Sequence, residues 1–117
     1  MKFMNLTPHT LNIDGVGQLP PSGITARVVH ERTPGTPIKT TTGLVRVIQQ
    51  DYGPVQNIPD PQDGTVYIVS AVVVSTILAG NDTKMRNRLG EDVFAPDTGP
   101  DAVRSHGQVS MVRGLVY

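Results

Sequence analysis

The chain has 117 residues, a length that fits one domain, and we treat residues 1–117 as a single unit with one modest core. Its 10 basic and 10 acidic side chains balance to a formal net charge of zero, so the composition gives no support for binding a nucleic-acid polymer. Cysteine is absent, which excludes disulfide scaffolds, thiolate metal sites and cysteine nucleophiles and is typical of a reducing compartment.

The N-terminal part of the chain is predicted to form short strands. Residues 3–6 and 10–14 are β-prone on either side of Thr7-Pro8-His9, where a proline interrupts any ladder, and a turn follows at Asp14-Gly15. No apolar stretch with a small-residue cleavage site opens the chain, so we expect no secretion. The period-two alternation of residues 24–32 then predicts a half-buried strand.

The middle of the chain continues with strands and turns. Residues 33–37 form a proline-rich loop, after which 38–42 and 44–50 are β-prone and Gly43 marks a bend or a hairpin. Turn-forming residues concentrate at 57–64. They lead into residues 66–69, a continuous apolar run that is typical of a central strand.

One short helix is predicted directly after this strand. Ser70 can cap residues 71–79, and Gly80-Asn81 can end the helix. The alternative is that the strand continues, because the valines at 72–74 are poor helix formers. The apolar run over 66–79 is too short and too often interrupted to span a bilayer, so we expect no membrane insertion.

Short elements are predicted for the rest of the chain: a polar turn of helix over 83–89, extended pieces at 92–95 and 102–104, and a terminal hairpin over 103–109. Together the patterns predict a mainly β fold, a β-rich α+β domain. We expect a compact antiparallel sheet or barrel-like domain with one short helix after Ser70. Because the core is small and strongly apolar, we also expect a homo-oligomer.

The segment from Phe94 to Arg104 holds the residues best suited to bind a phosphorylated ligand. Phe94 can stack on a base, Thr98 and the amides near Gly99 can meet phosphate oxygens, and Arg104 can make a bidentate phosphate contact. The alternative is a surface turn in which Phe94 enters the core and Arg104 is solvated. The full predicted ligand-binding set is Thr7, His9, Tyr67, Phe94, Asp97, Thr98, Gly99, Asp101, Arg104 and Arg113.

Within this set, Tyr67 and Arg113 contribute only if the terminal strands pair beside the turn. Asp97 and Asp101 have an alternative role as caps of the turn. His9 either points a neutral imidazole at the ligand or is held by backbone bonds.

No pattern in the sequence identifies a catalytic or metal-binding group. None of the histidines has an acidic or histidine partner at a metal-ligand spacing. The nucleophile elbow, the phosphate-binding P-loop and the dinucleotide fingerprint are all absent. We therefore predict no cofactor, no metal and no catalytic residue, and a hydrolase that uses His9 or a loop aspartate as base stays an alternative.

Three segments of the chain are distinctive: Asn5-Leu6-Thr7-Pro8-His9, Tyr67-Ile68-Val69-Ser70, and residues 96–104, which read Pro-Asp-Thr-Gly-Pro-Asp-Ala-Val-Arg. In these segments the chain resembles a family of small tailed-phage and prophage proteins, mostly of unassigned function. The resemblance implies a phage-encoded protein that acts in the host cytoplasm.

A looser analogy connects the chain to small phage proteins that sequester cyclic or ADP-ribose-derived immune signals. Such a sponge needs only stacking rings, phosphate-binding arginines and backbone donors, with pockets at subunit boundaries. The analogy implies a protein that binds and sequesters a nucleotide-derived host immune signal. The alternatives are a hydrolase of a small phosphorylated ligand and a virion or assembly protein without a small ligand.

Overall fold

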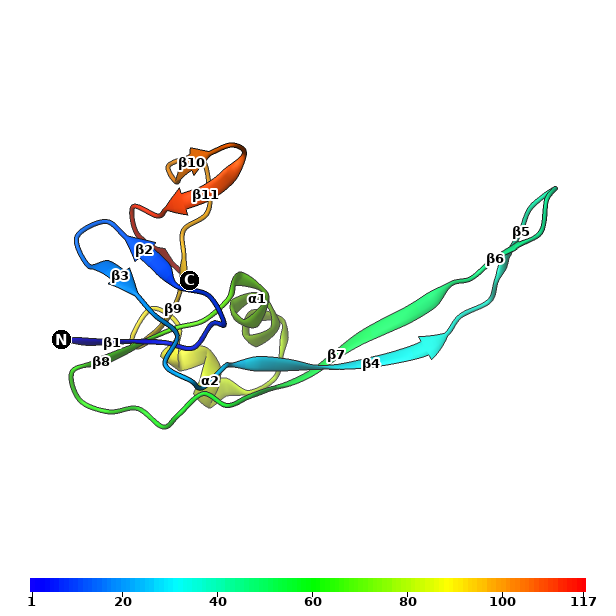
Figure 1. Cartoon of the computed structure of the whole chain (residues 1–117). Coiled ribbons are helices and arrows are strands. Elements are labelled where there is room, and N and C mark those ends of the chain that lie inside the picture. Colours follow the sequence, from blue (N-terminus) through cyan, green and yellow to red (C-terminus); the bar gives the residue numbers. More distant parts are fainter.

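The computed structural model describes all residues, 1–117, and shows a small body from which one long β-hairpin arm projects (Figure 1). The molecule measures 58 × 38 × 24 Å and has a radius of gyration of 17.5 Å. A compact domain of this length has a radius of gyration of about 13 Å. The prediction of a compact domain is therefore wrong, because the arm lengthens the molecule well beyond its core.

The body is built on a four-stranded mixed sheet in the order β1-β8-β9-β12. Strand β1 (Lys2–Asn5) and strand β9 (Val93–Pro96) both lie parallel to β8 (Thr65–Ile68), whereas β12 (Leu115–Val116) runs antiparallel to β9. The predicted antiparallel pairing therefore holds for the two-stranded sheets described below, but the central sheet is mixed. The barrel-like alternative is wrong, because no sheet closes into a barrel. The β-rich α+β class is confirmed.

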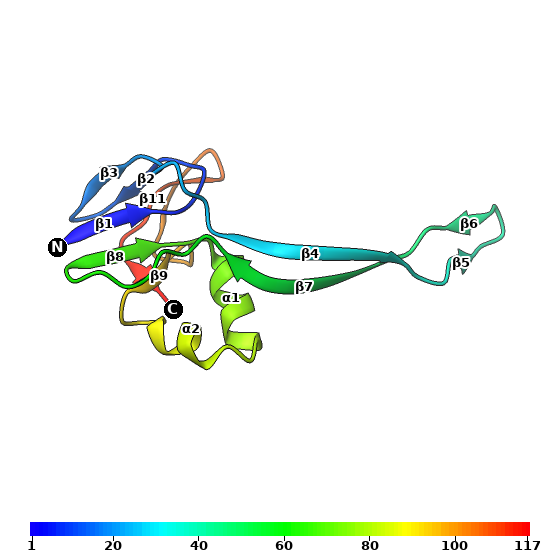
Figure 2. The ribbon, with the colours of Figure 1, turned by 90° about the horizontal axis from the view of Figure 1, so that it is seen from below.

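Two short helices connect β8 to β9. Helix α1 (Ala71–Ala79) has the predicted bounds, although the Ser70 side chain makes no capping hydrogen bond. Helix α2 (Thr83–Arg88) is a second helix where we expected only one polar turn. Figure 2 shows both helices on one side of the central sheet, and the small hairpins described next on the other.

Two small hairpins complete the body. Strand β2 (Leu11–Ile13) pairs with β3 (Gly17–Leu19), and β10 (Val103–Ser105) pairs with β11 (Gln108–Met111). The second pair confirms the predicted terminal hairpin, whose turn residues His106 and Gly107 both have positive φ. A minor hydrophobic cluster formed by Ile13, Ala102 and Val112 joins the two hairpins.

The arm consists of β4 (Arg27–Pro34) and β7 (Ile48–Gln56) in antiparallel register, with β5 (Ile38–Lys39) and β6 (Leu44–Val45) at its tip. The register runs from Val28 opposite Val55 to His30 opposite Tyr52, so β7 carries one residue more than β4 at this point. This β-bulge places Gly53-Pro54 where the arm leaves the body, and a proline there cannot donate to the ladder.

The main core lies between the central sheet, α1 and the base of the arm. It comprises Leu6, Ala26, Val28, Tyr67, Val69, Val73, Val74, Ile77, Val93 and Ala95. Neither helix is long and apolar enough to cross a bilayer. The arm beyond its base contributes no residue to this core, although residues 24–32 were predicted to form a half-buried strand.

Candidate functional site

The turn at residues 97–101 is held by its own polar groups. The Asp97 carboxylate accepts a hydrogen bond from the Gly99 amide at 3.0 Å. The guanidinium of Arg104 donates to the carbonyl oxygens of Thr98 at 2.8 Å and Gly99 at 3.2 Å. Asp97 thus caps the turn as in the surface-turn alternative. Arg104, which that alternative left solvated, instead binds carbonyl oxygens of the turn.

Arg113 lies beside the same turn. Its Nε atom donates to the carbonyl oxygen of Asp101 at 3.1 Å, and its Nη1 atom lies 3.9 Å from the Asp14 carboxylate. The structure thus brings together six of the ten predicted residues around one exposed turn: Asp97, Thr98, Gly99, Asp101, Arg104 and Arg113.

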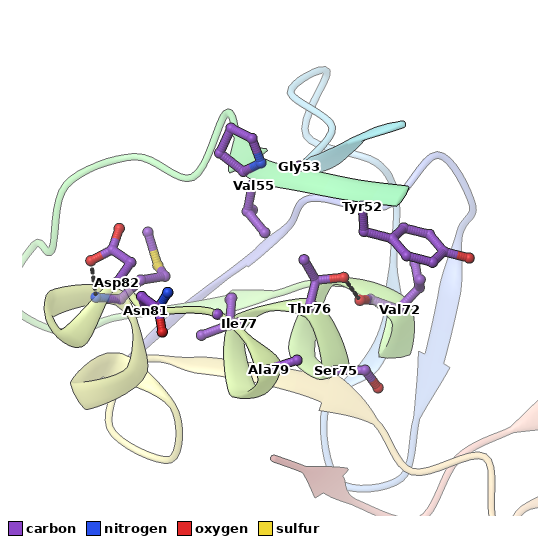
Figure 3. Close-up of a pocket in the computed structure, with 13 residues that line it drawn as sticks. Tyr52, Gly53, Val55, Val72, Ser75, Thr76, Ile77, Ala79, Asn81 and Asp82 are labelled. Atoms are coloured by element: carbon purple, nitrogen blue, oxygen red, sulfur yellow. Dashed lines mark hydrogen bonds between the residues drawn. The ribbon is translucent and has the colours of Figure 1, made fainter. Parts of the chain in front are cut away.

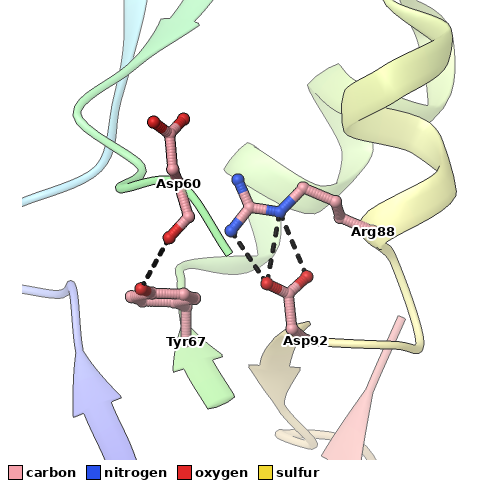
Figure 4. A network of polar contacts seen from close by, with 4 residues as sticks. All are labelled: Asp60, Tyr67, Arg88 and Asp92. Atoms are coloured by element: carbon pink, nitrogen blue, oxygen red, sulfur yellow. Dashed lines mark hydrogen bonds and ion pairs between the residues drawn. The ribbon is translucent and has the colours of Figure 1, made fainter. Parts of the chain in front are cut away.

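The two predicted aromatic residues do not face this turn together. Phe94 is half-buried and packs edge-on against Tyr117, with ring centroids 5.9 Å apart. Tyr67 is fully buried, and its hydroxyl donates to the carbonyl oxygen of Asp60 at 3.0 Å. Figure 4 shows that the Arg88 guanidinium covers the Tyr67 ring. Tyr67 is therefore a core residue that a ligand cannot reach.

Thr7 and His9 are organised by Asn5, a buried residue that the sequence reasoning did not select. The Asn5 side chain donates to the carbonyl oxygens of His9 at 2.7 Å and Leu19 at 2.9 Å. Its Oδ1 atom accepts from the Thr7 amide and hydroxyl at 2.9 and 2.7 Å. The His9 imidazole is exposed and makes no hydrogen bond. This network explains the Asn5–His9 segment as a folding element.

A pocket of about 620 Å³ lies at the base of the arm, between β7 and the helices (Figure 3). Its walls include the apolar side chains of Val55, Val72, Ile77 and Met85. Asp82 is the only charged residue among those that line it. The sequence reasoning missed this pocket because its walls come from β7 and from α1–α2, which gave no sign of meeting.

The arm presents unpaired groups to solvent. At its tip, the side chains of Ile38, Leu44 and Val45 are 58%, 70% and 50% exposed. Nearer the base, Glu31 lies directly opposite Asp51 in the ladder. Neither carboxylate forms a salt bridge, and neither does any cation of the arm. The cations of the arm are Arg27, Arg32, Lys39 and Arg46.

No protein-family model matches the chain, and the searches of curated proteins and of solved structures found no match either. No group of three or more His, Cys, Asp or Glu side chains is placed to hold a metal ion. The arm and the pocket at its base are therefore the features on which a functional proposal can rest.

Proposed function

We propose that this protein is a building block of a homo-oligomeric assembly and that the arm is the part which reaches a second copy. The observation that carries the proposal is the arm itself: a two-stranded ribbon with an apolar tip that no other part of the chain covers. An isolated two-stranded hairpin is only marginally stable in water. Both of its edges also expose unpaired backbone groups, which favour pairing with another chain.

A second apolar surface supports the proposal. Helix α1 contains no charged residue, although it lies on the surface of the body. Val72 and Leu78 on this helix are 48% and 53% exposed. A surface helix normally carries charged or polar residues on its outer face, so an uncharged outer face favours contact with a partner.

The free energy gained by burying the tip, compared with the free-energy cost of association, indicates how large the contact must be. The tip residues Ile38, Leu44 and Val45 are already partly buried, so burying the rest of each side chain contributes about 1–2 kcal/mol. Association itself costs about 4–15 kcal/mol in lost translational and rotational freedom. The tip alone therefore offsets only the low end of this cost, and a stable oligomer needs further contacts along the ribbon or on the body.

Analytical ultracentrifugation across micromolar concentrations tests this proposal. We expect the native chain to sediment above the monomer mass and a variant with Ile38→Ser, Leu44→Ser and Val45→Thr to sediment as a folded monomer. The control is Val109→Ser on β11, which removes an exposed valine of the body and should leave the oligomer intact. A native chain that stays monomeric throughout contradicts the proposal. The alternative of a virion or assembly protein, which follows from the phage resemblance, is tested separately by mass spectrometry of purified phage particles.

The binding and sequestration of a nucleotide-derived signal is our second proposal, and the observation that favours it is the pocket. Its volume of about 620 Å³ lies within the usual range of small-molecule sites, about 300–1,000 Å³. The Tyr52 ring and the polar side chains of Ser75, Thr76 and Asn81 lie among its walls. Incubation with ADP-ribose followed by denaturation separates a sponge, which releases intact ligand, from the hydrolase alternative, which releases products.

A matched pair of variants locates the ligand within this second proposal. Loss of a bidentate phosphate contact at Arg104→Ala weakens affinity about 30- to 150-fold if the turn binds the ligand. If the pocket binds it, Thr76→Val weakens affinity and Arg104→Ala does not. Titration calorimetry with ADP-ribose on both folded variants distinguishes the two sites, and absence of heat with the native chain rejects both.

A further inference from the structure

The apolar tip and the apolar pocket lie at opposite ends of the same arm. Figures 1 and 2 both show the tip projecting far from the body, whereas the pocket is formed where β7 meets α1 (Figure 3). The arm is an antiparallel ribbon over residues 27–56, made of the β4-β7 ladder with its one bulge near the base and the short β5-β6 ladder at the tip. The tip therefore cannot reach the pocket of its own chain.

When the arms of two copies lie side by side in opposite directions, each tip can reach the pocket of the other copy. When the tip of one copy reaches the base of the other arm, the second tip necessarily lies at the base of the first. We propose that two copies associate in this way, each tip seated in the pocket of the other. The contact is then reciprocal and closes on a twofold axis, the commonest symmetry of homo-oligomers.

The charges of the arm favour this arrangement. Lys39 lies within the tip, directly opposite Leu44 in the ladder, and Arg46 directly follows Val45. No acidic residue occurs between positions 32 and 50. At the other end, the pocket has Asp82 as its only charged wall residue, and Asp51 precedes its wall residue Tyr52. Antiparallel arms place the cationic end of each copy against the acidic base of the other.

The opposed carboxylates of Glu31 and Asp51 give a second reason. Like charges directly opposite each other in an antiparallel ladder are destabilising, and no cation of the same chain forms a salt bridge with either. Nearby, Arg32 and Arg46 line one hollow together with Pro34 and Ile48, again without an anionic partner. In the antiparallel pair, the second arm supplies cations for the carboxylates of Glu31 and Asp51 and carboxylates for the guanidinium groups of Arg32 and Arg46.

The occupant of the pocket is thus a second copy of this chain, and the inference rests on the proposed assembly function. The tip supplies Ile38, Leu44 and Val45, which match the apolar walls formed by Val55, Val72 and Ile77. The volume of about 620 Å³ leaves room for several such side chains. A small ligand and a linear filament are the competing outcomes of the test.

Engineered disulfides test the inference cleanly because the native chain has no cysteine. Leu44→Cys at the tip and Val72→Cys at the pocket are introduced into separate chains that carry different affinity tags. After mixing and mild oxidation we expect a covalent heterodimer that contains both tags. The matched control replaces Val72→Cys with Val109→Cys, an exposed valine of similar size on β11, and should leave the chains uncoupled.

The same substitutions in one chain decide the symmetry. A chain with both Leu44→Cys and Val72→Cys gives a covalent dimer and nothing larger if the arms are exchanged reciprocally. A ladder of higher species means a head-to-tail filament and overturns the antiparallel arrangement.

Ultracentrifugation of the unoxidised protein tests the docking of the tip in the pocket separately from the proposed homo-oligomeric assembly. An oligomer whose cross-linking equals that of the control overturns the docking site but leaves the assembly function standing. A monomer overturns both. A monomer that retains a small molecule by native mass spectrometry assigns the pocket to a ligand instead.

Discussion

The guanidinium of Arg88 lies over the ring of Tyr67, with its central carbon 5.5 Å from the ring centroid. The same guanidinium binds the Asp92 carboxylate through Nε at 3.1 Å and Nη2 at 2.9 Å. These contacts connect the end of α2 to β8 and to the start of β9 (Figure 4). The Arg88 guanidinium also covers one side of the buried Tyr67 ring, so this charged group takes part in the core packing.

The change Asp92→Asn should destabilise the fold. The amide keeps the shape of the side chain but removes the charge that the Arg88 guanidinium faces, and both side chains are mostly buried, at 13% and 16% exposed. We expect the free energy of unfolding to fall by about 1–3 kcal/mol, measured by urea denaturation. Asp63→Asn, in the exposed loop before β8, should change it by less than about 0.5 kcal/mol. Equal effects of the two substitutions would show that the Arg88 contact contributes nothing.

The change Asn5→Ala should destabilise the N-terminal part of the body. Its side chain is 1% exposed and satisfies two carbonyl oxygens together with the amide and hydroxyl of Thr7. Because these groups would stay buried without partners, we expect the free energy of unfolding, measured by thermal denaturation, to fall by about 1–3 kcal/mol. Asn12→Ala is the matched control, since that side chain is exposed and makes one long hydrogen bond at 3.5 Å. A loss at Asn12 equal to that at Asn5 would contradict the network.

Local sequence patterns predicted the elements of this fold better than their arrangement. The positions of Ser70 and Gly80 predicted the bounds of α1, although the Ser70 side chain makes no capping hydrogen bond, and the turn formers at 57–64 predicted the start of β8. In contrast, the parallel pairing of β1 with β8 joins segments about sixty residues apart in the chain. Parallel strands need a long crossover, and no local pattern distinguishes that crossover from a series of hairpins.

The arm shows a second limit of sequence reasoning. The alternation in 24–32 favoured a half-buried strand, and 44–50 was predicted only to be β-prone, but residues 30–34 and 49–52 are exposed on both faces of a free ribbon. Alternation reports that one face is apolar and does not say which molecule covers it. For the candidate site, six of the predicted ligand-binding residues lie in or beside one turn, and their role in binding a ligand stays a prediction. Residue chemistry did not predict that Arg104 would bind the carbonyls of the turn.

Gly90 and Gly107 test the packing of the C-terminal residue. Both have positive φ, at 82° and 79°, so alanine costs about 1–2 kcal/mol of backbone strain at either position. A Cβ atom at Gly90 would also lie 2.9 Å from the Tyr117 ring, whereas Gly107 has nothing within 4 Å. We expect Gly90→Ala to displace that ring and to lose its contact with Phe94, about 0.5–1.5 kcal/mol beyond the Gly107→Ala control.

A double-mutant cycle with Tyr117→Ala isolates this contact. In the Tyr117→Ala background, Gly90→Ala should cost no more than Gly107→Ala, because only the backbone strain remains. Unfolding followed by tyrosine fluorescence measures all the variants. A difference that persists without the Tyr117 ring would assign the effect of Gly90 to something other than this contact.

The change Asp51→Lys should act in opposite directions on the single chain and on the assembly. Within one chain it replaces a like-charge pair by an attractive pair with Glu31, which stabilises the ladder by about 0.2–1 kcal/mol. Between antiparallel arms it places a cation at the base, where the Lys39 and Arg46 end of the partner arrives. We expect self-association to weaken by about 1 kcal/mol, about fivefold in Kd.

Mixing this variant with Lys39→Glu chains should restore association between unlike chains. In about 1 M salt the effect should disappear, because the screening length falls to about 3 Å. Asp63→Lys, in a loop of the body, should leave the Kd unchanged. A variant that gains stability in unfolding and also associates more tightly would reject the antiparallel placement of the arms.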